Sequence, residues 1–216
     1  AMGLIPLQEP KGAVNELRPI IRELKMCGAM LPSTGANMPH LGSEQYWPIY
    51  EGAEGLGCAI GIHGGAHEGM LMDDMSPYAP VNALGHPWGQ MVNFAGIVFN
   101  GVFDKFPGVR IGFLEAGCAW VLTCMERFTR SWASHVQYDP RGRFLKLRAG
   151  ETVGDYVRRQ VEEDRIFIGV EGNELTIADA IRVLGNKPFI FSSDYPHEVD
   201  AETCKAELEE LQENQQ

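Results

Sequence analysis

The chain has 216 residues, 44% of them hydrophobic and 22% charged, a composition typical of a globular domain with its own core. Its formal net charge of −11 excludes nucleic-acid or anionic-membrane binding through bulk electrostatics, and no apolar stretch reaches the roughly 18 residues that span a bilayer. Five cysteines without CxxC spacing predict buried thiols, no disulfide framework and a reducing, cytoplasmic compartment.

Short apolar segments alternate with helical patterns along the chain. The expected strands cover residues 2–7, 27–31, 58–63, 109–115, 165–171 and 189–193. The expected helices cover residues 10–25, 44–56, 86–106 and 152–163, two further stretches that end near residues 135 and 184, and residues 201–212. Strands this short and this rich in Ile, Val and Phe are typical of a parallel sheet buried on both faces. No domain boundary interrupts the six strand–helix units, so residues 1–216 are expected to form one domain.

Four polar residues stand at the carboxyl ends of four successive expected strands: His63, Glu115, Glu171 and Asp194. In parallel α/β proteins these strand ends gather on one face, and that face carries the active site. We therefore expect the four side chains to converge. Imidazole and carboxylate are common zinc ligands, which makes His63 and Asp194 candidates for metal binding and catalysis.

Each candidate also has a structural interpretation. Asp194 precedes Tyr-Pro and suits a turn carboxylate, while His63, flanked by glycines, could be a hydrogen-bonded core histidine. Glu115 and Glu171 could each pair with an arginine. The candidate arginines are Arg110, Arg127, Arg130 and Arg165.

The segment after the third strand contains further histidines and carboxylates. We interpret His67, Asp73 and Asp74 as solvated loop or lid residues, because Gly64-Gly65 disfavours a helix there. His86 opens an expected helix, where it either caps the helix or reaches a substrate. The sequence lacks GxGxxG, GK[ST] and GxSxG motifs, which removes support for a nicotinamide dehydrogenase, a P-loop NTPase or an α/β-hydrolase.

Several segments, in order along nearly the whole chain, resemble one family. They are GLIPLQEP, MCGAMLPS, GCAIGIHGG, FNGVFDKFPGVRIGFLEAGCAWV, RIFIGVEGNE and FIFSSDYPHE. They resemble the amidohydrolase-related family, in the metal-dependent branch that includes aminocarboxymuconate-semialdehyde decarboxylase and resorcylate-type decarboxylases. The resemblance implies a TIM (β/α)8 barrel with one divalent metal ion, expected to be zinc, at its C-terminal face. It further implies that His63 is the fifth-strand metal ligand and that Asp194 is the eighth-strand ligand and proton-transfer group.

The sequence departs from the family pattern in two respects. The family takes further ligands from an HxH or ExH motif on its first strand, and no such motif precedes His63. The six strands then correspond to strands three to eight, with strands one and two missing, so residues 1–216 are a partial barrel domain. Many decarboxylating members also carry a histidine where Ala116 follows Glu115. Glu115, His86 and His197 are the expected substrate-binding residues.

The resemblance implies a decarboxylase (carboxy-lyase) or a hydrolase that acts on a small carboxylic acid, aromatic acids included. Asp194 moves the proton in either reaction. The missing first-strand motif favours an alternative, a truncated and non-catalytic remnant or binding module with the same fold. Two missing strands would expose apolar sheet edges, which predicts association into a homo-oligomer, with a dimer as the expected state.

Overall fold

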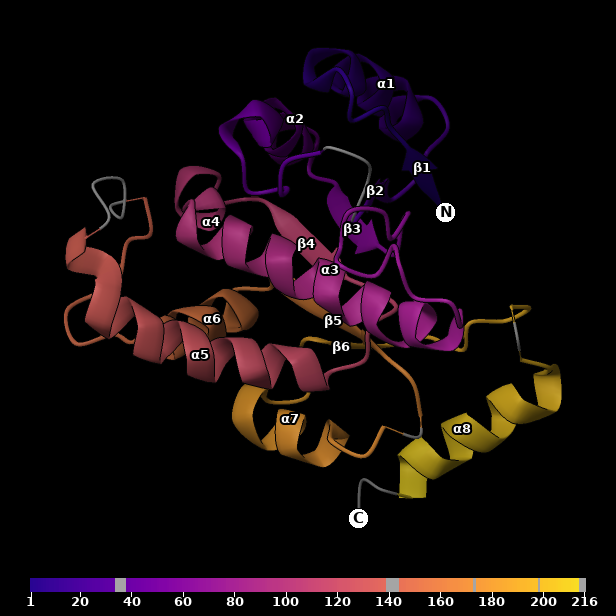
Figure 1. Cartoon of the computed structure of the whole chain (residues 1–216). Coiled ribbons are helices and arrows are strands. Elements are labelled where there is room, and N and C mark those ends of the chain that lie inside the picture. The colour runs from indigo at the N-terminus through magenta and orange to yellow at the C-terminus, as the bar shows by residue number, and fades with distance from the viewer. Residues whose placement is uncertain (34–37, 139–143, 173, 198, 214–216) are drawn as a thin grey trace.

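The computed structural model describes residues 1–33, 38–138, 144–172, 174–197 and 199–213 (Figure 1). Its centre is one parallel sheet of six strands that lie in chain order. These are β1 (Met2–Leu4), β2 (Gly28–Pro32), β3 (Ala59–His63), β4 (Arg110–Phe113), β5 (Ile166–Val170) and β6 (Phe189–Phe191). Within the described residues, β1 and β6 are the two edges of the sheet. A sheet in which each strand pairs with the next, after an intervening helix, has the order of six successive units of a TIM-type barrel.

Helices connect the strands and cover one face of the sheet, with α3 and α5 lying across it side by side (Figure 1). The α-helices are α1 (Pro10–Arg22), α2 (Trp47–Leu56), α3 (Ala79–Phe99), α4 (Val102–Lys105), α5 (Ala119–His135), α6 (Val153–Glu162), α7 (Ile177–Leu184) and α8 (Ala201–Glu213). Two 3-10 turns, η1 (Glu44–Tyr46) and η2 (Val136–Tyr138), adjoin α2 and α5. None of the helices described is long and apolar enough to cross a bilayer.

The helix ends follow local sequence signals. Gly57 ends α2 with a left-handed φ of 67°, and Thr152 begins α6 with a capping box that Asp155 completes. The prediction of a single helix over residues 86–106 was wrong at both ends. α3 begins seven residues earlier, with Pro80 in its first turn, and Gly101, at φ 64°, separates it from α4.

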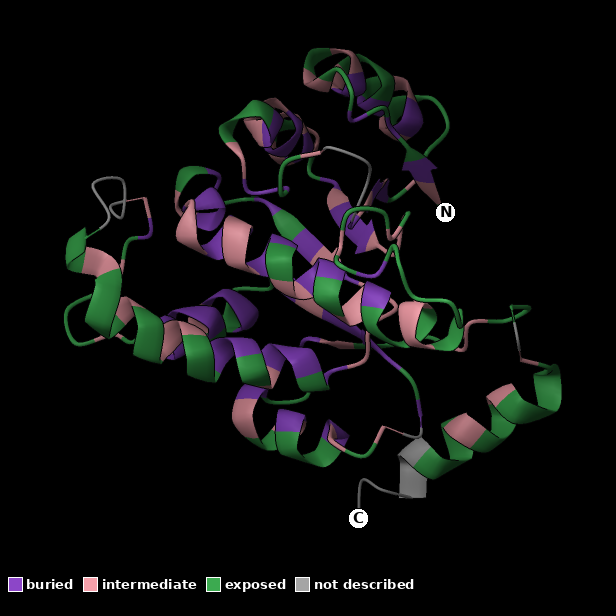
Figure 2. Ribbon diagram, in the orientation of Figure 1, coloured by how far each residue is buried: buried purple, intermediate pink, exposed green. Residues whose placement is uncertain are grey.

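The expectation that the strands are buried on both faces holds only for the inner strands, since Leu4 on β1 and Ile190 on β6 are exposed. Alternate side chains of β2 to β5, such as Ile60, Ile62 and Phe113, are fully buried against the helices. Figure 2 colours the residues by how far they are buried. The other face carries small residues and methionines. Gly61, for example, pairs in register with Met30 and Gly112, and methionine side chains pack over it. His63 lies on this second face because it is two residues beyond Gly61.

Candidate functional site

The four polar residues at the strand ends line a common cavity, as their positions in the sequence predict. His63 is the last residue of β3, while Glu115, Glu171 and Asp194 follow β4, β5 and β6. All four border a cavity of about 260 Å³ whose apolar wall includes Val170. The roles of these residues in catalysis and metal binding stay predictions at this point.

A second hollow of about 370 Å³ opens over the same strand ends. It shares His63, Glu115 and Asp194 with the first cavity and adds His197 from the turn after Asp194. The backbone N–H of His197 donates to the carbonyl of Asp194 at 2.8 Å, which holds this turn together. Of the three expected substrate-binding residues, Glu115 and His197 therefore border a cavity, whereas His86 lies behind Glu115.

Two imidazoles contact one oxygen of the Glu115 carboxylate. Oε2 lies 2.9 Å from Nε2 of His63 and 3.0 Å from Nδ1 of His86. Nδ1 of His63 faces the carbonyl of Gly64 at 3.2 Å. The alternative pairing with arginine fails in the described part of the chain, where no Arg forms an ion pair with Glu115 or Glu171.

The backbone is strained at the two acidic residues nearest His63. Glu115 has φ 57° and Asp194 has φ 55°, in the left-handed region that L-residues with a Cβ avoid. Such a conformation costs about 1–3 kcal/mol per residue and persists only where the surroundings enforce it. Lys25, Leu71 and Asp164 share this conformation outside the two cavities, so it is the combination of the strained backbone with a place at the cavity that distinguishes Glu115 and Asp194.

Helix α3 contributes a row of polar side chains that the sequence analysis missed. Gln90 and Asn93 are 0% and 1% exposed, and together with His86 they occupy positions i, i+4 and i+7 of the helix. Gln90 donates to the carbonyls of Ile62 and Leu114 at 2.8 and 2.9 Å, so it holds the ends of β3 and β4 together. The available signal was the spacing, since these polar residues interrupt an otherwise apolar helical face.

His67 lies in the loop after β3, as predicted, but it is half-buried and not solvated as expected. Its ring packs edge-on against His86 with centroids 5.0 Å apart, and its Nε2 is buried without a hydrogen-bond partner. Burial, and then the neighbouring His86, lower the pKa of His67. Asp73 and Asp74 are exposed, as predicted, and the Asp73 carboxylate accepts the N–H of Gly69.

The site gathers negative charge. Partial burial raises the pKa of Glu171, and the carboxylates of Glu174, Glu207, Asp194 and Glu115 raise it further. Glu174 is turned toward the backbone, because its carboxylate accepts the N–H groups of residues 118 and 171. None of the described lysines or arginines forms an ion pair with these five carboxylates. A bound cation would offset this charge.

The donor chemistry fits a divalent cation in part. His63 offers an imidazole nitrogen and Asp194 a carboxylate to the same cavity, and Oε2 of Glu115 is buried without a well-aligned hydrogen bond. Over the described ranges, however, no three His, Cys, Asp or Glu side chains gather at metal-binding spacing. The residues thus supply ligands of the right type but not a complete set.

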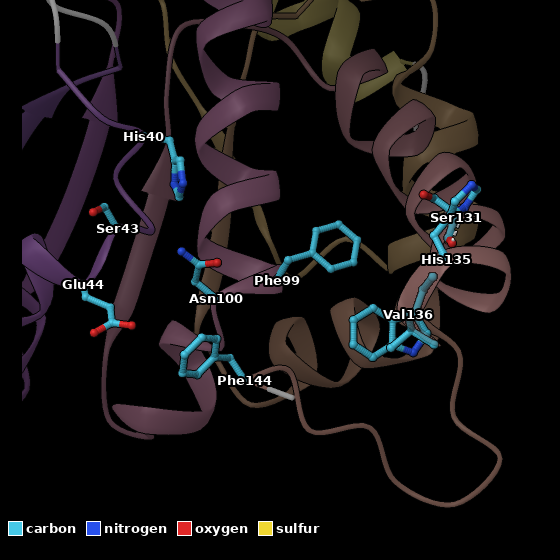
Figure 3. Close-up of a pocket in the computed structure, with 10 residues that line it drawn as sticks. His40, Ser43, Glu44, Phe99, Asn100, Ser131, His135, Val136 and Phe144 are labelled. Atoms are coloured by element: carbon cyan, nitrogen blue, oxygen red, sulfur yellow. Dashed lines mark hydrogen bonds between the residues drawn. The ribbon is translucent and has the colours of Figure 1, made fainter. Parts of the chain in front are cut away.

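A larger hollow of about 530 Å³ lies on the helical layer, away from the strand ends (Figure 3). Phe99 and His135, the last residues of α3 and α5, border it, and His40 contributes from the loop before η1 and Glu44 from η1. The ring of His135 faces the Ser131 carbonyl of its own helix at 3.1 Å. No carboxylate–imidazole pair forms among its described residues, whereas Glu115 contacts two imidazoles at the strand ends. The strand ends are therefore the better candidate for a catalytic site.

Comparison with known sequences gives one consistent family. Residues 1–213 match the family model described as Amidohydrolase. Gamma-resorcylate decarboxylase of Polaromonas sp. is 26% identical over 208 residues, which cover 90% of this chain and 59% of that protein. The 2-amino-3-carboxymuconate-6-semialdehyde decarboxylase of Dictyostelium discoideum is 30% identical over 122 residues, which cover 56% of this chain and 33% of that protein.

Solved structures agree on the fold. The 5-carboxyvanillate decarboxylase of Sphingomonas paucimobilis superposes with a TM-score of 0.76 at 21% identity, covering 94% of this chain and 58% of that one. The D314N mutant of 5-carboxyvanillate decarboxylase from Novosphingobium aromaticivorans, with bound manganese and 3-methoxy-4-hydroxy-5-nitrobenzoic acid, gives 0.77 at 20% identity, covering 95% and 57%. The fold is therefore of the TIM-barrel type, and the chain spans less than two thirds of each of these relatives.

Proposed function

The chain belongs to the amidohydrolase family, and from that premise we propose that it forms part of a metal-dependent carboxy-lyase site for a small aromatic carboxylic acid. The observation that carries the proposal is that His63, Glu115 and Asp194, from three different strand ends, line one cavity. The resorcylate and carboxyvanillate decarboxylases to which the chain is similar support this substrate class. A cavity of about 260 Å³ lies near the lower end of the range for ligand sites, which favours a single ring.

His63 and Asp194 are the residues that would hold the metal ion. The ion would act as a Lewis acid and orient the substrate carboxylate. The resemblance led us to expect zinc, but the related carboxyvanillate decarboxylase contains manganese, so we propose manganese as the first ion to test.

The side chains of this chain would then divide the work of decarboxylation. Leu114, Val170 and Phe191 form the apolar part of the wall that would receive the ring. Asp194, at the mouth shared by both cavities, would deliver a proton to the ring carbon as its bond to the departing CO₂ breaks. The Gly64 carbonyl would hold the His63 ring through Nδ1, which leaves Nε2, beside Glu115, as the nitrogen that could bind the metal ion.

Hydrolysis is the second candidate, because Ala116 stands where many decarboxylating members of the family carry a histidine. Asp194 would in that case accept a proton from the attacking water. A non-catalytic remnant is the third, and the lack of three gathered ligands in the described residues favours it.

Decarboxylation is tested by incubating the 216-residue chain with Mn²⁺ and 2,6-dihydroxybenzoate or 5-carboxyvanillate and measuring CO₂ and the phenolic product. Asp194→Asn should lower the rate about 10²–10⁴-fold, the usual contribution of a proton-transfer group. His63→Ala should lower the bound manganese per chain, while His135→Asn, on the outer helical layer, should change neither quantity. Cleavage of esters or lactones without CO₂ would favour hydrolysis, and a chain without bound metal or turnover would favour the remnant.

We propose that residues 1–216 form a single partial barrel domain, since the buried hydrophobic residues form one cluster from Ile5 to Leu184. Leu4 on β1 is 79% exposed and Ile190 on β6 is 46% exposed, which supports an oligomer that covers these edges. The five free cysteines support a cytoplasmic location.

A further inference from the structure

We propose that His86 is a positioning residue, which fixes the Glu115 carboxylate against His63 and thereby sets the His63 imidazole for the reaction. The inference rests on the proposed function, in which His63 and Glu115 belong to the site. It assigns His86 a role different from direct substrate contact, because His86 borders neither cavity and its polar contacts at the site are with Glu115. The rings of His86 and His63 also lie 6.3 Å apart.

The first support is that one nitrogen of His86 contacts both the side chain and the backbone carbonyl of Glu115. Nδ1 lies 3.0 Å from Oε2 of the side chain and 3.1 Å from the backbone carbonyl oxygen of the same residue. Both oxygens are acceptors, so this arrangement requires the hydrogen on Nδ1. The hydrogen bond is the one to the carbonyl, whereas the contact with Oε2 is close but not aligned as a hydrogen bond. Together the two contacts restrain the side chain relative to its own backbone.

The second support is that the backbone of Glu115 needs such a restraint. Its φ of 57° is unfavourable for a residue with a Cβ, and it persists only if neighbouring groups enforce it. Gln90, one turn after His86 on α3, donates to the carbonyl of Leu114, while His86 contacts the carbonyl of Glu115. The same Gln90 amide also donates to Ile62, the residue before His63. One face of α3 therefore fixes both partners of the His63–Glu115 contact.

The third support is that the His86 ring packs closely against the backbone at Gly64 and against the ring of His67. A Cβ on Gly64 would overlap the ring atoms of His86, so only glycine at this position admits the ring. On the other side His67 packs edge-on at 5.0 Å, and its own ring lies over Gly85, where a Cβ would lie 2.5 Å from it. The ring of His86 is thus confined on both sides.

The experiment compares three variants of the full chain. His86→Asn places an amide donor near the position of Nδ1, whereas His86→Leu removes the donor at similar volume. His135→Asn is the matched control, because the His135 ring faces a carbonyl of its own helix and lies away from the strand ends. The side-chain ¹⁵N and ¹H resonances of His63 report the contact with Glu115 directly, and their measurement does not require an active enzyme.

We expect His86→Leu to shift the His63 resonances. It should also lower kcat about 10–100-fold, the usual scale for loss of a supporting hydrogen bond at an active site, and change KM less than about threefold. His86→Asn should restore most of both, and His135→Asn should match the wild type. If His86→Leu does not fold, His86→Gln, whose amide reaches the position of Nε2 instead, takes its place. His63 resonances that do not change, or an Asn variant no better than Leu, would overturn the inference. A wild-type chain without turnover would refute the proposed function alone, since the resonances still decide the role of His86.

Discussion

Replacing Gly64 with alanine perturbs the His86 ring without changing any charged or polar group. The new Cβ would lie 2.6 Å from Nε2 and 2.7 Å from Nδ1 of that ring, closer than real Cβ contacts come. The ring must turn away, which separates Nδ1 from Glu115. The hydrogen bond lost is the one to the Glu115 backbone carbonyl, which is worth about 0.5–1.5 kcal/mol, and overpacking costs about 1–3 kcal/mol. Because turning relieves part of the overlap, we expect the free energy of unfolding to fall by about 1–3 kcal/mol.

Urea unfolding of the purified chain at neutral pH measures this difference. The same substitution at Gly55 is the control, because that glycine lies inside α2 and a Cβ there meets nothing within 4 Å. Gly55→Ala should raise the free energy of unfolding by roughly 0.5–1 kcal/mol, through the lower entropy of the unfolded chain. The two substitutions should thus act with opposite signs. A Gly64→Ala chain as stable as the wild type would show that the ring does not occupy the space assigned to it.

Two further substitutions test the electrostatic and hydrogen-bonding arguments. Burial and nearby carboxylates raise the pKa of Glu171. The folded chain therefore binds a proton at Glu171 more tightly than the unfolded chain does. The stability that this proton contributes is lost as the pH rises through the folded-state pKa. Glu171→Gln should therefore raise the urea midpoint at pH 7–8 and change it little near pH 4; a lower midpoint at pH 8 would contradict the sign. Arg165, 6% exposed, donates to Gln160 at 2.6 Å and to the carbonyls of Phe103 and Phe106 at 2.5 and 2.8 Å. Arg165→Met should cost about 3–5 kcal/mol in the same assay, since it leaves the Gln160 side-chain oxygen and the Phe103 carbonyl without this donor, and a loss below about 1 kcal/mol would refute that reasoning.

The sheet and the placement of the site could be predicted because both depend on short-range patterns. The strands are brief apolar runs, and a polar residue at the end of each run needs only the parallel arrangement to be placed on the functional face. His63, Glu115, Glu171 and Asp194 line one cavity for this reason. The prediction required no knowledge of which helix packs where.

Helix boundaries and loop conformations depended on signals that the sequence analysis weighed wrongly. Pro80 was counted with the loop, although proline is favoured in the first turn of a helix, where its missing N–H has no partner to lose. Gly101 was counted within a helix, although glycine can adopt the positive φ that separates two helices. His67 follows two glycines, which correctly excluded a helix there but gave no information about packing against His86.

Contacts between α3 and the strand ends could not be read from local spacing, and they change the meaning of a missing motif. The family pattern places a histidine just after Glu115, and Ala116 stands there instead, which taken alone weakens a decarboxylase interpretation. In the fold, however, His86 brings an imidazole from the helix to within 3.0 Å of the same Glu115. The helix that packs on the strand ends thus brings an imidazole to the site, but as a positioning residue it acts through Glu115 and does not contact the substrate. The Asn and Leu variants of His86 test this role.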